Sequence, residues 1–312
     1  DKPDMPLEEM MELMPGPDFP TGGIIANKKD LPAIYETGVG KIKLRGKIEV
    51  ELGRRKADRD KLVISEIPYT MIGAGINKFL VDIAELVENK TLSDVVDISN
   101  QSSKEGIRIV LELKKDADIE KIRNILYKKT KLEDTFGVNM LAIAHGRPET
   151  LNLRGILQNY LEFQYENTTH KYQALLEKEL EKKEIREGLI RACDVIDLII
   201  AILRGSKNLK DAKACLMNGD ISKIQFKHPG FEEDAKQLNF TEKQANAILE
   251  MRLYKLIGLE ILALQKEYKE CLKRIAEYEK VLKSRDGMNK VIKEDLDHIK
   301  EEFAEPRKTL IE

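Results

Sequence analysis

Residues 261–282 read ILALQKEYKECLKRIAEYEKVL, and this stretch decides the fold. Its apolar and ring-bearing residues, together with one cysteine, recur in alternating steps of three and four. They are Ile261, Leu264, Tyr268, Cys271, Ile275, Tyr278 and Leu282. Such steps place one stripe along one face of an α-helix, which is the heptad pattern of a coiled coil. A second helix has to cover this stripe, so the stretch predicts a coiled-coil partner elsewhere in the chain.

A second heptad stripe lies upstream, in a helix predicted over residues 153–185. Steps of three and four again connect its members, which are Leu153, Ile156, Tyr160, Phe163, Asn167, His170 and Ala174. Shorter helical segments and a predicted surface loop at residues 218–239 separate the two stripes. We therefore expect the chain to run out along one helix, build a small all-α tip and return along the other helix. The result is an antiparallel coiled coil.

Residues 1–150 have a different composition, in which Gly, Pro and β-branched residues punctuate short segments. Alternation and turn residues predict strands at residues 23–26, 41–52, 61–67, 94–99 and 107–113. Helical spacing predicts helices at residues 29–36, 77–89 and 118–129. This mixture predicts an α+β domain with a largely antiparallel sheet in a chain that is mostly α.

The composition excludes several classes of protein. The 312 residues carry 53 Lys and Arg against 55 Asp and Glu, and the net charge of −2 excludes a uniformly basic protein. No apolar run approaches the roughly 18 residues of a membrane-spanning helix, and the acidic start is not a signal peptide. Three scattered cysteines without a CxxC pair predict reduced thiols in a cytoplasmic protein and no zinc site. The chain does not begin with Met, so we expect a piece of a longer protein.

The predicted strand at residues 41–51 carries cations at alternate positions, which are Lys41, Lys43, Arg45 and Lys47. A period of two places them on one face and the apolar residues on the other. Residues 41–61 hold nine Lys and Arg against four Asp and Glu, an excess of 9 − 4 = +5. Such a face suits a nucleic-acid backbone. An ordinary solvated sheet face explains the same pattern, and the pattern alone slightly favours it.

The turn MIGAGINK at residues 71–78 precedes a predicted helix. Its glycines allow close approach of the backbone, the amides at the helix start can bind an anion, and Asn77 and Lys78 add polar groups. A flexible loop capped by Asn77 is an equal alternative. No Ser or Cys lies in a recognisable nucleophile context, and His145 and Arg147 fit a polar turn. The sequence predicts no metal site and no self-contained active site.

Several motifs, taken together and in order, resemble the A subunit of the bacterial DNA gyrases, within the type IIA DNA topoisomerases. The motifs are MPGPDFPT (14–21), EIPY (66–69) with Asn77-Lys78, FGVNM (136–140) with HGRP (145–148), and TEKQANAI (241–248) with MRLYKLIGLE (251–260). Residues 252–260 are closer to gyrase than to topoisomerase IV, which stays an alternative. The motifs occur in the order of the family over nearly the whole chain, so the resemblance is specific.

The resemblance implies a tower domain (1–150), an outgoing coiled-coil helix (151–186), a tip that forms the exit gate (187–258), and returning helices (259–312). It also implies that the DNA-cleaving tyrosine lies upstream, because no Tyr of this chain follows an Arg. Mg²⁺ and ATP are used by the B subunit of gyrase in an A2B2 holoenzyme, so no cofactor is expected here. The family's tower contacts the bent duplex, which makes DNA-contact candidates of Lys41, Lys43, Arg45, Lys47, Asn77 and Lys78.

A dimer gate is expected at the end of the arm, where residues 241–259 begin with the N-cap Thr241. One helical face there carries the predicted gate residues Ile248, Leu249, Arg252, Leu253 and Leu256. Burial inside the tip is the alternative for some of them. The implied partners are double-stranded DNA, a second copy of the chain and the gyrase B subunit, without a membrane. A coiled-coil dimerising scaffold and a protein-interaction module without DNA affinity are the rival functions.

Overall fold

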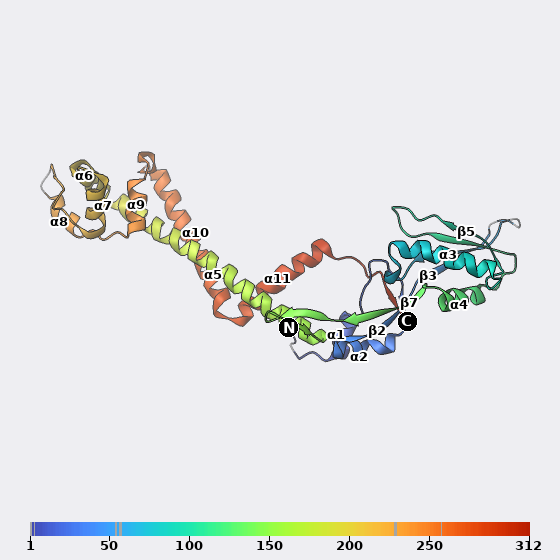
Figure 1. Cartoon of the computed structure of the whole chain (residues 1–312). Helices are drawn as coiled ribbons and strands as arrows, with labels where there is room; N and C mark the ends of the chain where they lie inside the picture. The colour runs from blue at the N-terminus through green and yellow to red at the C-terminus, as the bar shows by residue number, and fades with distance from the viewer. Residues whose placement is uncertain (1, 3, 54, 56–57, 228–229, 257) are drawn as a thin grey trace. The chain divides into compact units, whose positions relative to one another are not determined.

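The computed structural model (Figure 1) describes all residues except 1, 3, 54, 56–57, 228–229 and 257, and it leaves out the side chains of residues 253, 256 and 259. Two compact units are present. The first contains residues 1–162 together with 303–312, and the second contains residues 163–302. The four-part division expected from the sequence stays a prediction.

The first unit contains a four-stranded sheet with the order β10-β1-β2-β7. Its strands are β10 (Leu310–Ile311), β1 (Ile24–Ile25), β2 (Val39–Arg45) and β7 (Glu133–Asn139). The helices α1 (Leu7–Leu13) and α2 (Leu31–Thr37) belong to the same unit, and a 3-10 turn, η1 (Lys28–Asp30), leads into α2. One face of the sheet packs on a core that includes Ile25, Leu31, Ile42 and Leu44. The end of the chain completes the sheet, because β10 pairs with β1 in parallel.

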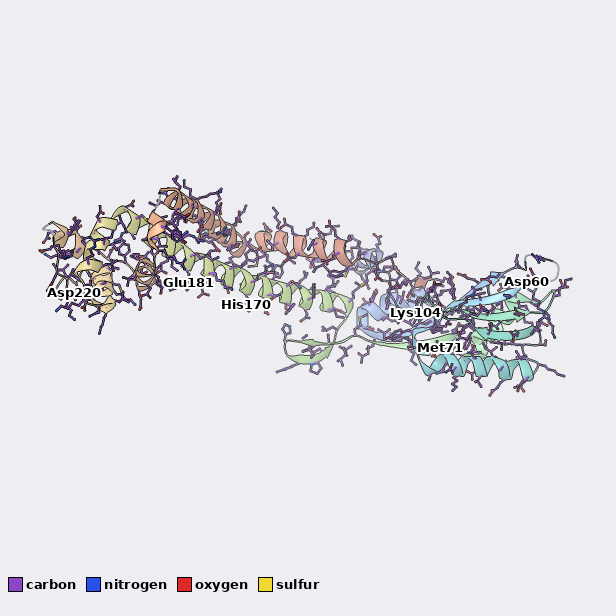
Figure 2. The ribbon with its side chains drawn as sticks, turned by 90° about the horizontal axis from the view of Figure 1, so that it is seen from above. Asp60, Met71, Lys104, His170, Glu181 and Asp220 are labelled. Atoms are coloured by element: carbon purple, nitrogen blue, oxygen red, sulfur yellow. The ribbon has the colours of Figure 1, made fainter. Side chains whose placement is uncertain are left out.

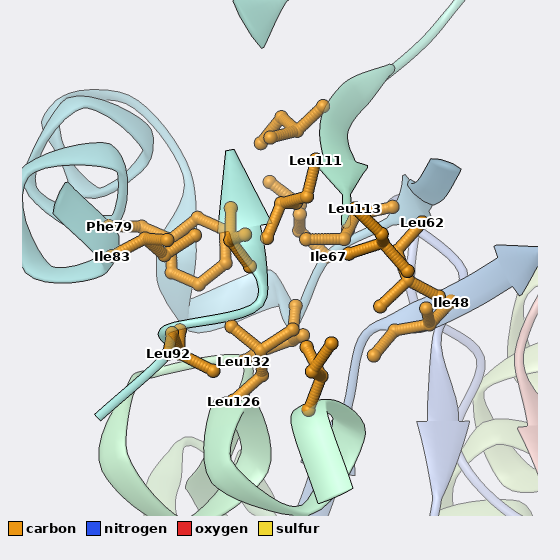
Figure 3. Close-up of a cluster of buried hydrophobic side chains, with 14 of the residues drawn as sticks. Ile48, Leu62, Ile67, Phe79, Ile83, Leu92, Leu111, Leu113, Leu126 and Leu132 are labelled. Carbon is orange, nitrogen blue, oxygen red and sulfur yellow. The ribbon is translucent and has the colours of Figure 1, made fainter. Parts of the chain in front are cut away.

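A second sheet of the same unit has the order β3-β4-β6-β5 and is antiparallel throughout. Its strands are β3 (Lys47–Glu51), β4 (Lys61–Glu66), β6 (Ile109–Leu113) and β5 (Val95–Asn100). Two amphipathic helices, α3 (Ala74–Glu88) and α4 (Ile119–Lys129), pack on one face. Figure 3 shows the core between them, with Phe79 and Ile83 of α3 opposite Leu111 of β6. The α+β prediction is confirmed.

The single strand predicted at residues 41–52 was wrong, because the chain breaks at Gly46 and β2 and β3 join different sheets. A Cβ on this buried glycine would lie 2.4 Å from Leu132 Cδ1 and 2.7 Å from the carbonyl oxygen of Glu66. The bend therefore brings the backbone closer to its neighbours than any side chain allows. Further elements that local sequence patterns did not predict are the short helix α1, strands β7 and β10, and a hairpin of β8 (Leu141–Ala144) and β9 (Arg147–Thr150).

The second unit is helical and is built around its own small core. Its elements are the greater part of α5 (Leu153–Asp194), α6 (Ile196–Gly205), α7 (Leu209–Asn218), α8 (Phe231–Lys236), α9 (Glu242–Leu249), η3 (Leu253–Leu256), α10 (Gly258–Lys283) and most of α11 (Arg285–Phe303). The loop predicted at residues 218–239 was partly wrong, since it contains α8. Phe231 and Ala235 of α8 pack into the core of the tip, so tertiary burial stabilises a helix that local signals do not predict.

The helices α5 and α10 form the predicted antiparallel pair, because the residue numbers of the contacting residues fall along α5 as they rise along α10. Arg186 pairs with Glu267, Glu179 with Arg274, and the rings of Tyr172 and Tyr278 meet edge to face. The stripe of α10 is confirmed, since Cys271 and Ile275 are buried and the other members are half-buried.

The stripe predicted on α5 was wrong in phase. Phe163 is 58% exposed, and Asn167 and Ala174 also face solvent. His170 is exposed as well (Figure 2). The side that meets the returning helices carries Tyr165, Thr168, Tyr172 and Glu179 instead. Two of these four inward positions are polar, so apolar spacing alone selected a neighbouring stripe.

Candidate nucleic-acid interface

The uncovered face of β2 carries two exposed lysines. Ile42 and Leu44 are buried on the opposite face, which confirms the predicted alternation within β2. Lys41 and Lys43 are exposed and lie opposite Gly137 and Thr135 of β7. Neither lysine makes an ion pair with any residue that the structure describes. Small neighbours and free ammonium groups leave this face open to an extended anion.

The side chain of Asn27 ties the turn before η1 to the backbone of β2. Its Nδ2 donates to the Lys41 carbonyl oxygen (2.9 Å), and its Oδ1 accepts from the Lys43 backbone N–H (2.8 Å). The amide thus imitates a peptide group and continues the β1–β2 ladder by one step. The exposed Lys28 and Lys29 follow directly in η1. The sequence analysis missed them, although the Asn27-Lys28-Lys29 turn next to a basic strand was a usable signal.

The other two predicted cations of this segment are engaged within the fold. Nε of Arg45 donates to Glu133 Oε2, and the guanidinium lies 5.2 Å from the centre of the Tyr127 ring. Lys47 belongs to the other sheet, beyond Gly46. Its Nζ lies 2.9 Å from Glu49 Oε1, and the hydrogen bond to Glu49 raises the pKa of Lys47. The four predicted cations therefore divide into two free lysines and two paired side chains.

Asn77 and Lys78 occupy the second turn of α3 and are exposed. The helix starts earlier than predicted, at Ala74, and its N-cap is Gly73 with φ of 73° rather than Asn77. The helix α3, which carries Asn77 and Lys78, covers the β3-β4-β6-β5 sheet, whereas Lys41 and Lys43 belong to the β10-β1-β2-β7 sheet. No hydrogen bond, ion pair or ring contact links the two pairs in the described part of the chain.

The predicted gate residues of the tip differ in how far they are buried. Ile248 is 3% exposed and packs into the tip's own core, so it is not available on the surface. Leu249 is half-buried against that core, whereas Arg252 is exposed. The predicted side chains of Leu253 and Leu256 lie outside the described residues. Thr241 is confirmed as the N-cap of α9, in a capping box with Gln244.

An open cavity of about 480 Å³ lies between α5, α9, η3 and the start of α10. Its lining combines apolar side chains such as Leu189, Met251 and Leu264 with charged ones such as Arg252. Among the described side chains, Tyr254, which lines the cavity, is 48% exposed, and Leu262, which lies on α10 outside its lining, is 62% exposed. Exposed apolar side chains beside charged ones are typical of a surface that contacts another macromolecule.

Within the described ranges, no group of three or more His, Cys, Asp and Glu residues could hold a metal ion. Likewise, no helix among the described residues is long and apolar enough to cross a membrane. All three cysteines are free thiols. Burial raises the pKa of Cys215 to about 11, which keeps this thiol protonated and unreactive near neutral pH.

Comparisons with known proteins identify the family. A sequence profile that describes the A subunits of DNA gyrase and topoisomerase IV matches residues 1–297. This chain belongs to the family of DNA gyrase and topoisomerase IV A subunits. The expectation drawn from the motifs is thereby confirmed at the level of the family.

Individual relatives match the chain from end to end. The DNA gyrase A subunit of Clostridium acetobutylicum is 40% identical over 312 residues, which are 100% of this chain and 35% of that protein. The DNA topoisomerase 4 A subunit of Staphylococcus epidermidis is 36% identical over 100% of this chain and 36% of its own length. The DNA gyrase A subunit of Thermotoga maritima is 36% identical over 99% and 36%. The chain spans about a third of the length of these curated relatives.

Proposed function

We propose that this chain is the non-catalytic part of the DNA breakage–reunion subunit of a bacterial DNA gyrase. In this role it supports the cleaved duplex and forms the dimeric exit gate during ATP-dependent duplex passage in the cytoplasm. The observation that carries the proposal is the presence of the exposed Lys41 and Lys43 on the open face of β2, in a chain of this family. Mg²⁺, ATP and the A2B2 assembly belong to the complete enzyme, which includes the gyrase B subunit.

The physical basis for DNA support is phosphate binding by flexible ammonium groups. Lys41 and Lys43 project from one face of β2, and Asn27 holds Lys28 and Lys29 against its edge. Each lysine that neutralises a phosphate releases condensed counterions, so the contact favours any duplex without reading its sequence. Asn77 and Lys78 stay candidates for a separate contact at the start of α3.

Reversing both charges on β2 is the direct test of this contact. The double variant Lys41→Glu/Lys43→Glu is expected to bind duplex DNA roughly thirtyfold more weakly. We also expect its log–log salt slope to fall by about 2, because two phosphate contacts are lost. Fluorescence anisotropy with a labelled duplex of mixed sequence, over a series of KCl concentrations, measures both quantities.

Lys90→Glu/Lys104→Glu is the matched control. It makes the same change in net charge at two exposed lysines of other loops. An equal loss of affinity in the control, or unchanged binding in the β2 variant, would contradict the assignment of this face.

We also propose that a second copy of the chain closes the gate at the tip. The supporting features are the exposed Tyr254 and Leu262, the exposed Arg252 and the adjacent cavity. A twofold contact buries the same patch on both copies, so each exposed apolar residue contributes to the buried area once from each copy. A gate has to open and reclose, which favours a moderate interface with a polar rim. Of the predicted residues, the half-buried Leu249 is included in this proposal.

Sedimentation of the chain tests the gate. We expect a dimer at micromolar concentration and a folded monomer for Leu262→Asp, because a carboxylate cannot be covered there without losing its hydration. Leu209→Asp is the matched control, since Leu209 is 68% exposed on α7 and lies outside the proposed surface. A wild-type chain that stays monomeric at high concentration would refute the gate.

The A subunit of topoisomerase IV is the second candidate function. The relative from Staphylococcus epidermidis, a topoisomerase 4 protein that is 36% identical over the whole chain, favours it. The two assignments share the DNA contact and the gate. They differ in the reaction of the complete enzyme, which an assay on relaxed plasmid distinguishes by the appearance of negative supercoils.

A further inference from the structure

The outward face of α4 carries a second group of unpaired lysines. Lys121, Asn124 and Lys128 follow one another at helical spacing and are exposed, with Lys129 beside them. The opposite face of the helix is buried through Ile122 and Leu126. Further exposed lysines flank the helix, at positions 114 and 115 before it and 131 after it.

Acidic side chains offset this face only in part. A shallow hollow along it is lined by Lys121, Lys128 and Lys129 together with Asp118 and Glu120. Asp118 caps α4 by accepting the Lys121 backbone N–H (3.0 Å), and Glu120 pairs with Arg123 (2.9 Å). Across the part of the chain that the structure describes, none of the α4 lysines or their flanking lysines makes an ion pair.

The cations of the neighbouring sheet differ in this respect. Lys61 pairs with Glu112, Arg108 with Glu51, and Lys47 with Glu49. Interaction with the helix dipole explains lysines in the last turn of α4, such as Lys128. It does not explain Lys121 near the start of the helix. A ligand of opposite charge accounts for all of them.

Arg45 connects this face to the lysines of β2. Its guanidinium lies over the ring of Tyr127, and the Tyr127 hydroxyl donates to the Gly46 carbonyl oxygen (2.9 Å). The α4 helix is thus held at the end of β2, and Tyr127 is the residue next to Lys128. Lys43 and Arg45 share one face of β2, so the contact of Arg45 with Tyr127 places α4 next to the end of this face, although Arg45 itself is paired with Glu133.

We propose that the lysine face of α4 extends the nucleic-acid interface of β2 and binds the phosphate backbone of the same DNA duplex. This inference rests on the proposed function of the β2 face. A duplex is the ligand that the charge pattern fits, because it presents closely spaced phosphates along its whole length. The α4 contact lengthens the bound segment and carries no base recognition, since lysines meeting phosphates do not read sequence.

The test is the double variant Lys121→Glu/Lys128→Glu in the complete chain, with the same labelled duplex. We expect an affinity about tenfold weaker and a log–log salt slope lower by about 2. The neutral variant Lys121→Gln/Lys128→Gln should shift both quantities in the same direction by less. Both lysines are exposed, so an unchanged thermal transition by circular dichroism confirms folding.

The possible outcomes separate this inference from the proposed function. Normal binding by the α4 variant with impaired Lys41→Glu/Lys43→Glu overturns the inference and leaves the β2 face in place. Normal binding by both variants overturns both. An equal loss in Lys90→Glu/Lys104→Glu shows an effect of net charge alone and also overturns the inference. A loss that is confined to the β2 and α4 variants supports one continuous interface.

Discussion

Replacing Ile248 by aspartate is expected to unfold the helical tip, at a cost of roughly 5 kcal/mol. Ile248 is 3% exposed and packs in the core that α6, α7 and α9 share. The substitution removes buried apolar contacts and places a carboxylate among the apolar side chains of this core, so transfer and desolvation costs add. We expect the helical signal of the tip to disappear in a separate early transition on heating.

Hydrogen exchange of the amides of α7 and α9, together with circular dichroism, measures this loss. Leu209→Asp is the control, because its side chain is solvated and should change stability by no more than about 0.5 kcal/mol. A folded tip in the Ile248→Asp variant would contradict the burial of this residue. The result also affects the gate, since a monomer obtained with this variant would report unfolding rather than a lost interface.

Removing the charge of Glu179 is expected to lower the stability of the coiled coil by about 3 kcal/mol at neutral pH. The side chain is 7% exposed, and its oxygens accept from Lys182 Nζ (2.6 Å) and from Nε and Nη2 of Arg274 (3.1 and 3.0 Å). Its backbone carbonyl oxygen also accepts from the thiol of Cys271 (3.1 Å). Glu179→Gln keeps the shape of the side chain but leaves two cations without their counter-charge.

The pH dependence of this effect has a definite sign. Burial by itself raises the pKa of Glu179, but the hydrogen bonds from Lys182 and Arg274 outweigh it and lower the pKa from 4.5 to about 2. A carboxyl group whose pKa is lower in the folded state stabilises that state above the unfolded pKa. The stabilisation is lost as the pH falls from about 4.5 to about 2. The difference between wild type and Glu179→Gln should therefore shrink over this range.

Urea unfolding at several pH values measures the difference. Glu177→Gln, at an exposed position of the same helix, should stay within about 0.5 kcal/mol of wild type. A Glu179→Gln difference that stays constant down to low pH would show that packing, rather than charge, makes this contact.

Much of the fold followed from local sequence patterns. The heptad steps from Ile261 to Leu282 predicted both the helix and its buried face, because an apolar stripe can be covered only by another helix. Thr241 marked the start of α9 because its hydroxyl can accept from an unpaired amide of the first turn. Alternation in β2 placed Lys41 and Lys43 on the uncovered face, since successive side chains of a strand point to opposite sides. These predictions depend on neighbours within a few residues.

The availability of each cation depended on contacts that no local pattern contains. Lys41 and Arg45 share one face of β2, yet only the second meets Glu133, which lies 88 residues away in the chain. The basic face of α4 escaped the sequence analysis for the same reason. Along the sequence Asp116, Asp118 and Glu120 precede Lys121, and only the folded helix shows that Asp118 is the N-cap and that Glu120 pairs with Arg123.

The sequence by itself determined which elements form, where the coiled-coil helices and the α+β segment lie, and to which family the chain belongs. The tertiary structure alone decided the break at Gly46, the inward side of α5 with Thr168 and Glu179, the burial of Ile248, and the pairing of β10 with β1. Local periodicity states which residues of an element share a face. Which face is then covered depends on a partner that is distant in sequence, and the free energy of that contact outweighs the local preference.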